Sequence, residues 1–250
     1  MASRVVLGAA ALAATFSSAL GEELEWCGDA QYYPSEYTCF DDSTLCPILF
    51  GLPNQPCNGG CYAPEMYECD SGKLGLLSEA EGPFKLVSHS AVSRVDGHQL
   101  RACGNYLAIG AGARECNSCD EGAACDEYGN ETVLLGNGEM AADLPGGQFW
   151  YVNQTDGALM FTEGGDDEEA GIKLAGQQVT VYEDGFFSYT GTRSYWLACL
   201  RRLPGGTVGT TRSWRIFAPT PENLDNDDCE RIKLVVTSVA DRKQGAYKYE

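Results

Sequence analysis

Two short segments near the N-terminus carry the same cysteines, tyrosines and proline at the same spacing. Residues 27–39 read CGDAQYYPSEYTC and residues 57–69 read CNGGCYAPEMYEC, so five positions coincide at an offset of 30 residues. The coinciding pairs are Cys27/Cys57, Tyr32/Tyr62, Pro34/Pro64, Tyr37/Tyr67 and Cys39/Cys69. Cysteines cross-link small extracellular scaffolds, and exposed aromatic rings can pack against the flat faces of sugar rings. The repeat therefore predicts sugar binding before it predicts catalysis.

The segment around the repeat holds more aromatic side chains than it can bury. Eight occur between Trp26 and Tyr67, whereas a unit of ~50 residues has only a marginal core. Some of these rings must be exposed, and an exposed aromatic cluster indicates a ligand. The candidate ligand-binding residues are Trp26, Tyr32, Tyr33, Tyr37, Tyr62 and Tyr67.

Several of these aromatic residues have an alternative, structural role. Tyr37 and Tyr67 each lie two residues before a cysteine, where a ring can cover a disulfide. Phe50 lies in an apolar run and is expected in the core. Tyr32 and Tyr62, each two residues before a proline, are the better ligand candidates.

The sequence carries no signature of a catalytic site, and no catalytic residue is predicted. The chain has two histidines, His89 and His98, and it lacks the G-x-S-x-G nucleophile elbow of serine hydrolases. A carboxylate pair for glycoside hydrolysis stays open among the 36 acidic residues, because its geometry depends on the fold.

No metal or cofactor is predicted either. Cys116-x-x-Cys119 with Cys125 has no histidine nearby, so a disulfide-stapled loop is expected instead of a zinc site. The acidic run 163–169 matches no calcium-binding loop and is expected to be a solvated loop.

The N-terminus and the cysteine content predict secretion. Residues 1–21 combine a positive charge, a short apolar run and small residues at a cleavage site, as in a signal peptide. No later stretch approaches the ~18 apolar residues of a membrane-spanning helix. An even number of cysteines, 12, is expected to form disulfides, with the pairing left open: Cys27, Cys39, Cys46, Cys57, Cys61, Cys69, Cys103, Cys116, Cys119, Cys125, Cys199 and Cys229.

The net charge limits the classes of partner. The formal charge of −19 repels phosphate backbones and anionic lipid, so nucleic acid and membranes are not expected as partners. Asn130 and Asn153 begin N-x-T sequons and are predicted glycosylation sites. The oligomeric state stays open.

The elements that position these residues are expected to be mainly β. Residues 22–73 predict a small disulfide-rich module of loops and short strands, residues 74–83 a linker, and residues 241–250 a polar tail. Residues 84–240 show about ten short apolar runs between turns, which favours an all-β sandwich or barrel. Asp156-Gly157 and Asp184-Gly185 each predict the turn of a hairpin.

Residues 26–74 resemble the family 52 carbohydrate-binding module, which is appended to fungal endo-1,3-beta-glucanases. The resemblance rests on Cys-Gly-Asp at 27–29, Tyr-x-Pro-Ser-x-Tyr-x-Cys at 32–39, Leu-Cys-Pro at 45–47 and the spaced cysteines, tyrosines and proline of 57–69. One position differs between the halves, because Gln31 stands where the second segment has Cys61. The resemblance implies binding of β-1,3-glucan.

Residues 84–238 resemble a fungal secreted cell-wall protein family linked to phialide development. The residues that carry this resemblance are 144–148 (LPGGQ), 151–152, 156–159, 161–162, 196–199 and Trp214. Together the two resemblances imply a secreted, non-catalytic protein that binds cell-wall polysaccharide, β-1,3-glucan, through exposed tyrosines. Two alternatives remain open: a small secreted glycanase targeted by its module, and a structural cell-wall protein.

Overall fold

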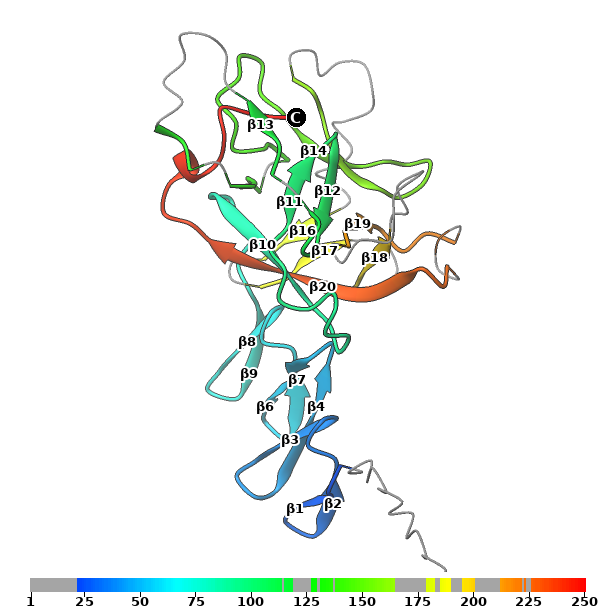
Figure 1. Ribbon diagram of the computed structural model, residues 1–250. Helices are drawn as coiled ribbons and strands as arrows, with labels where there is room; N and C mark the ends of the chain where they lie inside the picture. Colours follow the sequence, from blue (N-terminus) through cyan, green and yellow to red (C-terminus); the bar gives the residue numbers. More distant parts are fainter. Residues whose placement is uncertain are drawn as a thin grey trace, which may run out of the picture.

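The chain forms a slender N-terminal module followed by a larger β-domain, as seen in the computed structural model (Figure 1). The structure describes residues 22–113, 115–118, 127–129, 131–136, 138–164, 179–182, 185–189, 195–200, 212–221, 223 and 226–250. The mainly-β fold class is confirmed. Among these residues none forms a helix with the length and apolar character needed to span a bilayer.

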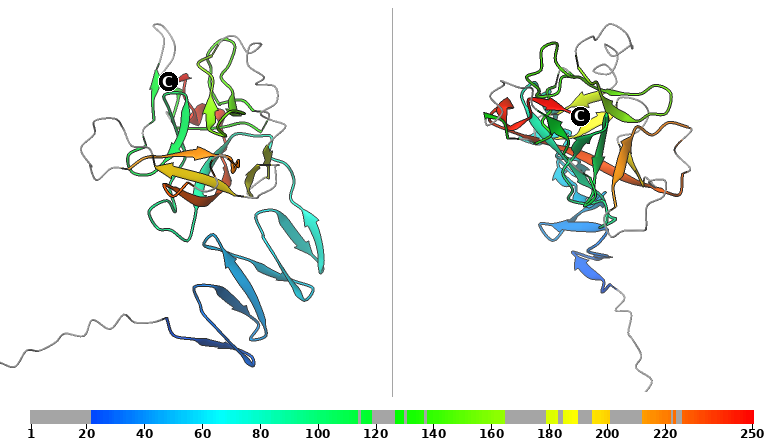
Figure 2. Two further views of the ribbon diagram at one scale, coloured as in Figure 1. Left: turned by 90° about the vertical axis from the view of Figure 1, so that its right-hand side faces the viewer. Right: turned by 45° about the horizontal axis from the view of Figure 1, so that its top comes forward.

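The module consists of successive antiparallel hairpins that follow one another in a zigzag (Figure 2, left). Its first unit, residues 25–53, contains β1 (Glu25–Cys27), β2 (Ala30–Tyr32), β3 (Tyr37–Phe40), β4 (Thr44–Leu49) and β5 (Leu52–Pro53). Its second unit, residues 55–76, contains β6 (Gln55–Cys57), β7 (Gly60–Tyr62), β8 (Tyr67–Asp70) and β9 (Lys73–Leu76). Strands β6, β7 and β8 lie 30 residues after β1, β2 and β3, so the repeat in sequence is a repeat in structure.

The same hydrogen bonds close the connecting turn in both units. The carbonyl of Tyr33 accepts from the amides of Glu36 and Tyr37 at 2.9 and 3.0 Å, and the carbonyl of Ala63 accepts from those of Met66 and Tyr67, both at 3.1 Å. The shared Pro34 and Pro64 stand directly after these carbonyl residues, where a fixed φ favours a turn.

Disulfides replace a hydrophobic core in the module. Cys27–Cys39 and Cys57–Cys69 staple the two units at equivalent positions, and Cys46–Cys61 joins one unit to the other. Of residues 22–73, all of which the structure describes, only Cys27 and Cys46 are buried apolar residues. The difference between Gln31 and Cys61 thus has a structural reason: Cys61 bonds to the first unit, whereas the part of the chain that the structure describes holds no unit before Gln31 to which a cysteine there could bond.

The β-domain is built from short antiparallel strands. They are β10 (Phe84–His89), β11 (Arg101–Cys103), β12 (Tyr106–Ile109), β13 (Asn117–Ser118), β14 (Trp150–Val152), β15 (Leu159–Phe161), β16 (Val179–Val181), β17 (Phe187–Tyr189), β18 (Trp196–Leu200), β19 (Trp214–Phe217), β20 (Cys229–Ser238) and β21 (Lys248–Tyr249), with a short 3₁₀ turn, η3 (Arg242–Gln244). The two hairpins expected around Asp156-Gly157 and Asp184-Gly185 are confirmed as β14–β15 and β16–β17.

The main sheet of the β-domain closes into a barrel. Its strands follow the order β10-β20-β18-β19-β12-β15-β14, with β11 paired to β12. Isolated bridges Phe84↔Leu134, Leu134↔Met140 and Glu139↔Phe149 connect the two edge strands. The inward residues form one core that includes Trp150, Trp196 and Phe187, with the rings of Phe187 and Trp196 stacked at 5.4 Å.

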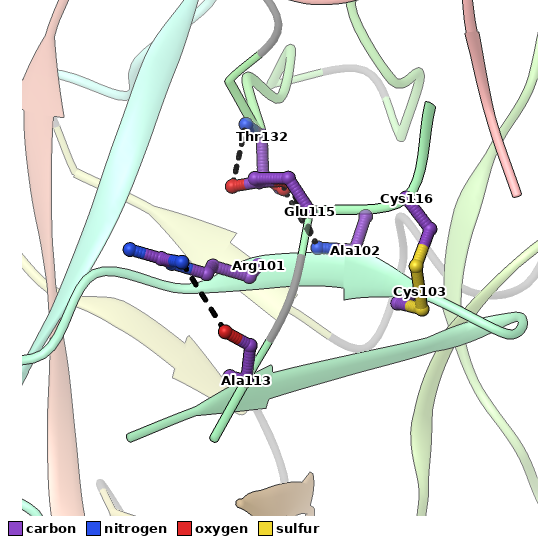
Figure 3. The surroundings of a disulfide bond; sticks show 7 residues. All are labelled: Arg101, Ala102, Cys103, Ala113, Glu115, Cys116 and Thr132. Carbon is purple, nitrogen blue, oxygen red and sulfur yellow. Dashed lines mark hydrogen bonds between the residues drawn. A yellow bond between two sulfur atoms is a disulfide. The ribbon is translucent and has the colours of Figure 1, made fainter. Parts of the chain in front are cut away.

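A disulfide and a partly buried carboxylate fix the loop after β12 to the barrel (Figure 3). Cys116 bonds to Cys103 of β11, and the neighbouring Glu115 accepts from the Thr132 hydroxyl at 2.6 Å and the Ala102 amide at 3.4 Å. Burial raises the pKa of Glu115 despite these hydrogen bonds. Glu115 therefore serves the fold, because its acceptors are occupied by the chain itself.

The structure differs from expectation at both ends of the β-domain. Residues 74–76, expected in a linker, belong to β9, and Ala80 is buried and donates to the Val181 carbonyl at 2.8 Å. The expected polar tail is anchored in the core, because the Tyr249 ring is fully buried and its backbone amide donates to the Gln148 side chain at 2.7 Å. Burial raises the pKa of the Tyr249 hydroxyl.

Candidate functional site

The aromatic candidates of the module differ strongly in exposure. Trp26, Tyr33 and Tyr37 are 65%, 44% and 39% exposed, whereas Tyr32, Tyr62 and Tyr67 are partly buried. Among the described residues, every exposed tryptophan or tyrosine lies in the first unit. The second unit has Pro56 and Ala63 at the positions of Trp26 and Tyr33. The two units therefore present different surfaces although their backbones repeat.

Strand alternation places Trp26 and Tyr32 on opposite faces of the first hairpin. Trp26 pairs with Gln31, and Glu25 pairs with Tyr32, in the β1–β2 register. Side chains of directly opposed residues share a face, and successive residues alternate between faces. Trp26 and Gln31 therefore form one face of the hairpin. Tyr32 and Glu25 form the other, together with the buried Cys27.

The hydroxyls of Tyr32 and Tyr62 are used within their own hairpins. Tyr32 donates to the Glu25 carboxylate at 3.0 Å, and Tyr62 donates to the Gln55 amide oxygen at 3.4 Å. Desolvation and the Glu25 carboxylate raise the pKa of Tyr32. Tyr32 and Tyr62 therefore make the same kind of hydrogen bond across their hairpins, which gives both tyrosines a structural role.

Exposed leucines accompany the aromatic residues and were missed by the sequence reasoning. Leu24, Leu49, Leu74 and Leu76 are each at least 40% exposed. Leu74 and Leu76 are separated by one residue of β9 and thus share a face. In sequence, the leucines at every second position of β9 indicate an apolar face of a strand. The strand is too short for this pattern to show whether that face is exposed to solvent.

Residues of the module contact the barrel at Phe50 and Glu65, with Tyr67 nearby. The Glu65 carbonyl accepts from the Phe186 amide at 2.8 Å, and the Phe50 ring stacks on Tyr195 at 6.1 Å. Burial raises the pKa of Tyr182, and Tyr67 of the module adds to this shift. Phe50, expected in the module core, thus packs between the module and the barrel.

A buried lysine completes this junction. Lys233 of β20 is 5% exposed, and its ammonium lies 5.1 Å from the Phe50 ring centroid and 4.4 Å from that of Phe186. Burial lowers the pKa of Lys233 to about 8, while the Glu65 carboxylate favours its charged form. Burial likewise raises the pKa of Glu65.

The barrel carries a small surface pocket of about 280 Å³ beside residues 144–147. Glu139, Asp143 and Arg242 line it, together with the ring of Phe149. The Arg242 guanidinium donates to the Ala142 carbonyl at 2.9 Å and lies 4.0 Å from the Asp143 carboxylate. Two carboxylates thus line one pocket, an arrangement that the sequence alone left open because the shape of the pocket depends on the fold.

The remaining predicted sites have different outcomes. Ten cysteines are paired, with Cys103–Cys116 and Cys199–Cys229 in the β-domain; no bond joins the module to the β-domain among the described cysteines. Cys119, Cys125, Asn130 and residues 165–169 of the acidic run lie outside the described residues. The described part of the chain holds no cluster of three or more potential metal ligands.

The glycosylation of Asn153 stays a prediction. In the structure the side-chain amide of Asn153 lies 3.7 Å from the Met160 sulfur.

The fold and the exposed rings define a disulfide-stapled repeat that presents an aromatic surface, and comparison with known proteins assigns its class. Residues 26–74 match the sequence model of a family described as carbohydrate binding. This segment is thus similar to carbohydrate-binding modules, and a stretch of the chain of about this length is similar to part of a glucanase.

That glucanase is the primary septum glucan endo-1,3-beta-D-glucosidase of Schizosaccharomyces pombe. The two sequences are 49% identical over 51 residues, which are 20% of this chain and 5% of the relative. No solved structure matches the chain. The resemblance of residues 84–238 to a cell-wall protein family stays a prediction.

Proposed function

We propose that the chain is a secreted, non-catalytic protein that binds cell-wall polysaccharide, specifically β-1,3-glucan, through the aromatic residues of its module. The observation that carries the proposal is the exposure of three aromatic side chains, Trp26, Tyr33 and Tyr37, in the first unit of a segment that matches a carbohydrate-binding family. Aromatic side chains at this exposure mark a binding surface. The glucanase relative supports β-1,3-glucan as the ligand, and the paired cysteines support an oxidising, extracellular location.

Binding to insoluble polysaccharide tests this proposal. The full chain should be depleted from solution by particulate β-1,3-glucan, and less so by chitin or cellulose, as measured by the protein left in the supernatant. Absence of retention on all three polysaccharides would overturn the proposal. Retention on chitin or cellulose alone would overturn its β-1,3-glucan part.

Loss of the two exposed tyrosine rings should weaken this retention. Tyr33→Ala with Tyr37→Ala should raise the apparent Kd for β-1,3-glucan by roughly tenfold or more, because aromatic contact residues often dominate binding energy. Tyr33→Phe with Tyr37→Phe is the matched control, since it keeps both rings. The turn itself should persist in both variants, because the Tyr33 carbonyl that closes it belongs to the backbone.

A second candidate function, a small glycanase, is favoured by the pocket that Glu139 and Asp143 share. A pair of carboxylates can serve as acid and as base or nucleophile in glycoside hydrolysis. The non-catalytic proposal predicts no release of reducing sugar from soluble β-1,3-glucan by the full chain. Release that falls by about 100-fold or more in Glu139→Gln would instead establish the glycanase.

A further inference from the structure

The first hairpin of the module has a face that the repeat leaves open. At the offset of 30 residues, Trp26 corresponds to Pro56 and Gln31 to Cys61. Pro56 and Cys61 are directly opposed in β6 and β7, and Cys61 bonds to Cys46 in β4 of the first unit. The face of the second unit is thus turned toward the preceding unit. Among the described residues no unit precedes the equivalent Trp26–Gln31 face, and Figure 1 shows the β1–β2 hairpin at the end of the module farthest from the barrel.

The side chain on this open face is unusual for the end of a repeat. Terminal repeats normally present a polar outer face to remain soluble. Here the face carries an indole that is 65% exposed. The other three tryptophans of the chain, Trp150, Trp196 and Trp214, are at most 5% exposed. A lone exposed tryptophan beside an amide side chain is suited to a ligand with one apolar face and a polar edge.

We propose that the Trp26–Gln31 face is the primary glucan platform of the module. One sugar ring of β-1,3-glucan stacks on the Trp26 indole, in the place that a preceding unit would occupy. The Gln31 amide hydrogen-bonds the hydroxyls at the edge of that ring. This inference rests on the proposed function and assigns its site. Tyr32 lies on the opposite face, with its hydroxyl bonded to Glu25, and is not part of the platform.

The charge of the first hairpin favours a neutral sugar over a second copy of the chain. Glu22, Glu23, Glu25 and Asp29 surround Trp26 in sequence and are all exposed. Two copies meeting at this face would bring these carboxylates together in molecules of formal charge −19. A neutral glucan carries no such repulsion.

Quenching of tryptophan fluorescence tests the platform directly in the full chain. Acrylamide should quench Trp26 preferentially, because the other three indoles are buried. Saturating laminarihexaose, a soluble β-1,3-glucan oligosaccharide, should protect that emission. Trp26→Ala should remove the quenchable component and raise the Kd for laminarihexaose by roughly tenfold or more. Trp26→Phe should retain part of the affinity.

Two substitutions serve as matched controls. Pro56→Ala changes the equivalent position of the second unit, and Tyr32→Phe removes the hydroxyl on the opposite face; both should bind as the unmodified chain does. A thiol assay that detects no free cysteine beyond that of the unmodified chain shows that Trp26→Ala is folded.

The possible results separate the platform from the proposed function. If the unmodified chain binds and Trp26→Ala binds equally well, the platform is overturned while the proposed function stands. If the unmodified chain binds no β-glucan, the proposed function fails and the platform with it. If Trp26→Ala instead abolishes a concentration-dependent dimer in sedimentation and leaves glucan binding unchanged, the face is a contact between copies.

Discussion

Removing the Cys46–Cys61 disulfide by the double change Cys46→Ala with Cys61→Ala should unfold the module while the barrel stays folded. The bond links the two units of a module whose only buried apolar residues are Cys27 and Cys46. A native disulfide in a small secreted domain contributes about 2–4 kcal/mol, and here no hydrophobic core compensates for its loss. The proposed binding to β-1,3-glucan should be lost together with the module structure.

Limited proteolysis with mass spectrometry measures this effect. Cleavage should appear within residues 22–73 and leave a resistant fragment that contains the barrel. The control is Cys199→Ala with Cys229→Ala, which removes a bond between directly opposed residues of β18 and β20. Those strands stay paired through the barrel core, so the barrel should remain protease-resistant at ambient temperature. Equal resistance of the module with and without Cys46–Cys61 would contradict the prediction.

The sequence predicted the module well because its information is local. The offset of 30 residues, the turn prolines and the cysteine spacing all act within one unit, and they recur as equivalent strands and hydrogen bonds. The side of the hairpin on which each ring lies was not predicted. That assignment depends on the register Trp26↔Gln31, which a three-residue strand is too short to reveal.

The barrel was predicted as a class, but its closure was not. Leu134 lies in one of the short apolar runs, but it bridges both Phe84 and Met140 without belonging to a strand, and the run does not show which strands it joins. The C-terminal residues were expected to be a tail because their sequence is polar. Tyr249 nevertheless fills the core and exchanges backbone hydrogen bonds with the Gln148 side chain, a contact across 101 residues of sequence. Such long-range contacts leave no local signal.

The same limit applies to the junction between module and barrel, which determines how the proposed platform is presented. Glu65 lies in the module and Lys233 on β20, and nothing near either residue in sequence indicates the other. In the structure the Lys233 ammonium lies beside the rings of Phe50 and Phe186, and the Glu65 carboxylate favours its charged form. A module fixed in this way would hold its Trp26 end away from the barrel rather than move as a free appendage (Figure 1).

Reversing the charge at this junction, by Lys233→Glu, should release the module from the barrel. The change places a second carboxylate beside the Glu65 carboxylate and against the electron-rich faces of Phe50 and Phe186. A buried charge without compensation costs about 3–5 kcal/mol. Small-angle scattering should show a larger radius of gyration, and calorimetry a lower unfolding temperature. Lys73→Glu reverses an exposed lysine of β9 and should change neither quantity appreciably.

The pH dependence of stability tests independently whether the junction buries the charge of Lys233. Its folded-state pKa of about 8 lies below the ordinary value of 10.5, so the unfolded chain binds more protons between these values. The contribution of Lys233 to stability should therefore increase as pH rises from 8 toward 10.5 and the buried ammonium loses its charge. The Lys233→Met variant lacks this contribution. As pH falls from 10.5 toward 8, the unmodified chain should therefore lose stability relative to Lys233→Met, as measured by the free energy of unfolding of each protein. Parallel pH profiles for the two proteins would show that Lys233 is solvated and that the junction does not bury its charge.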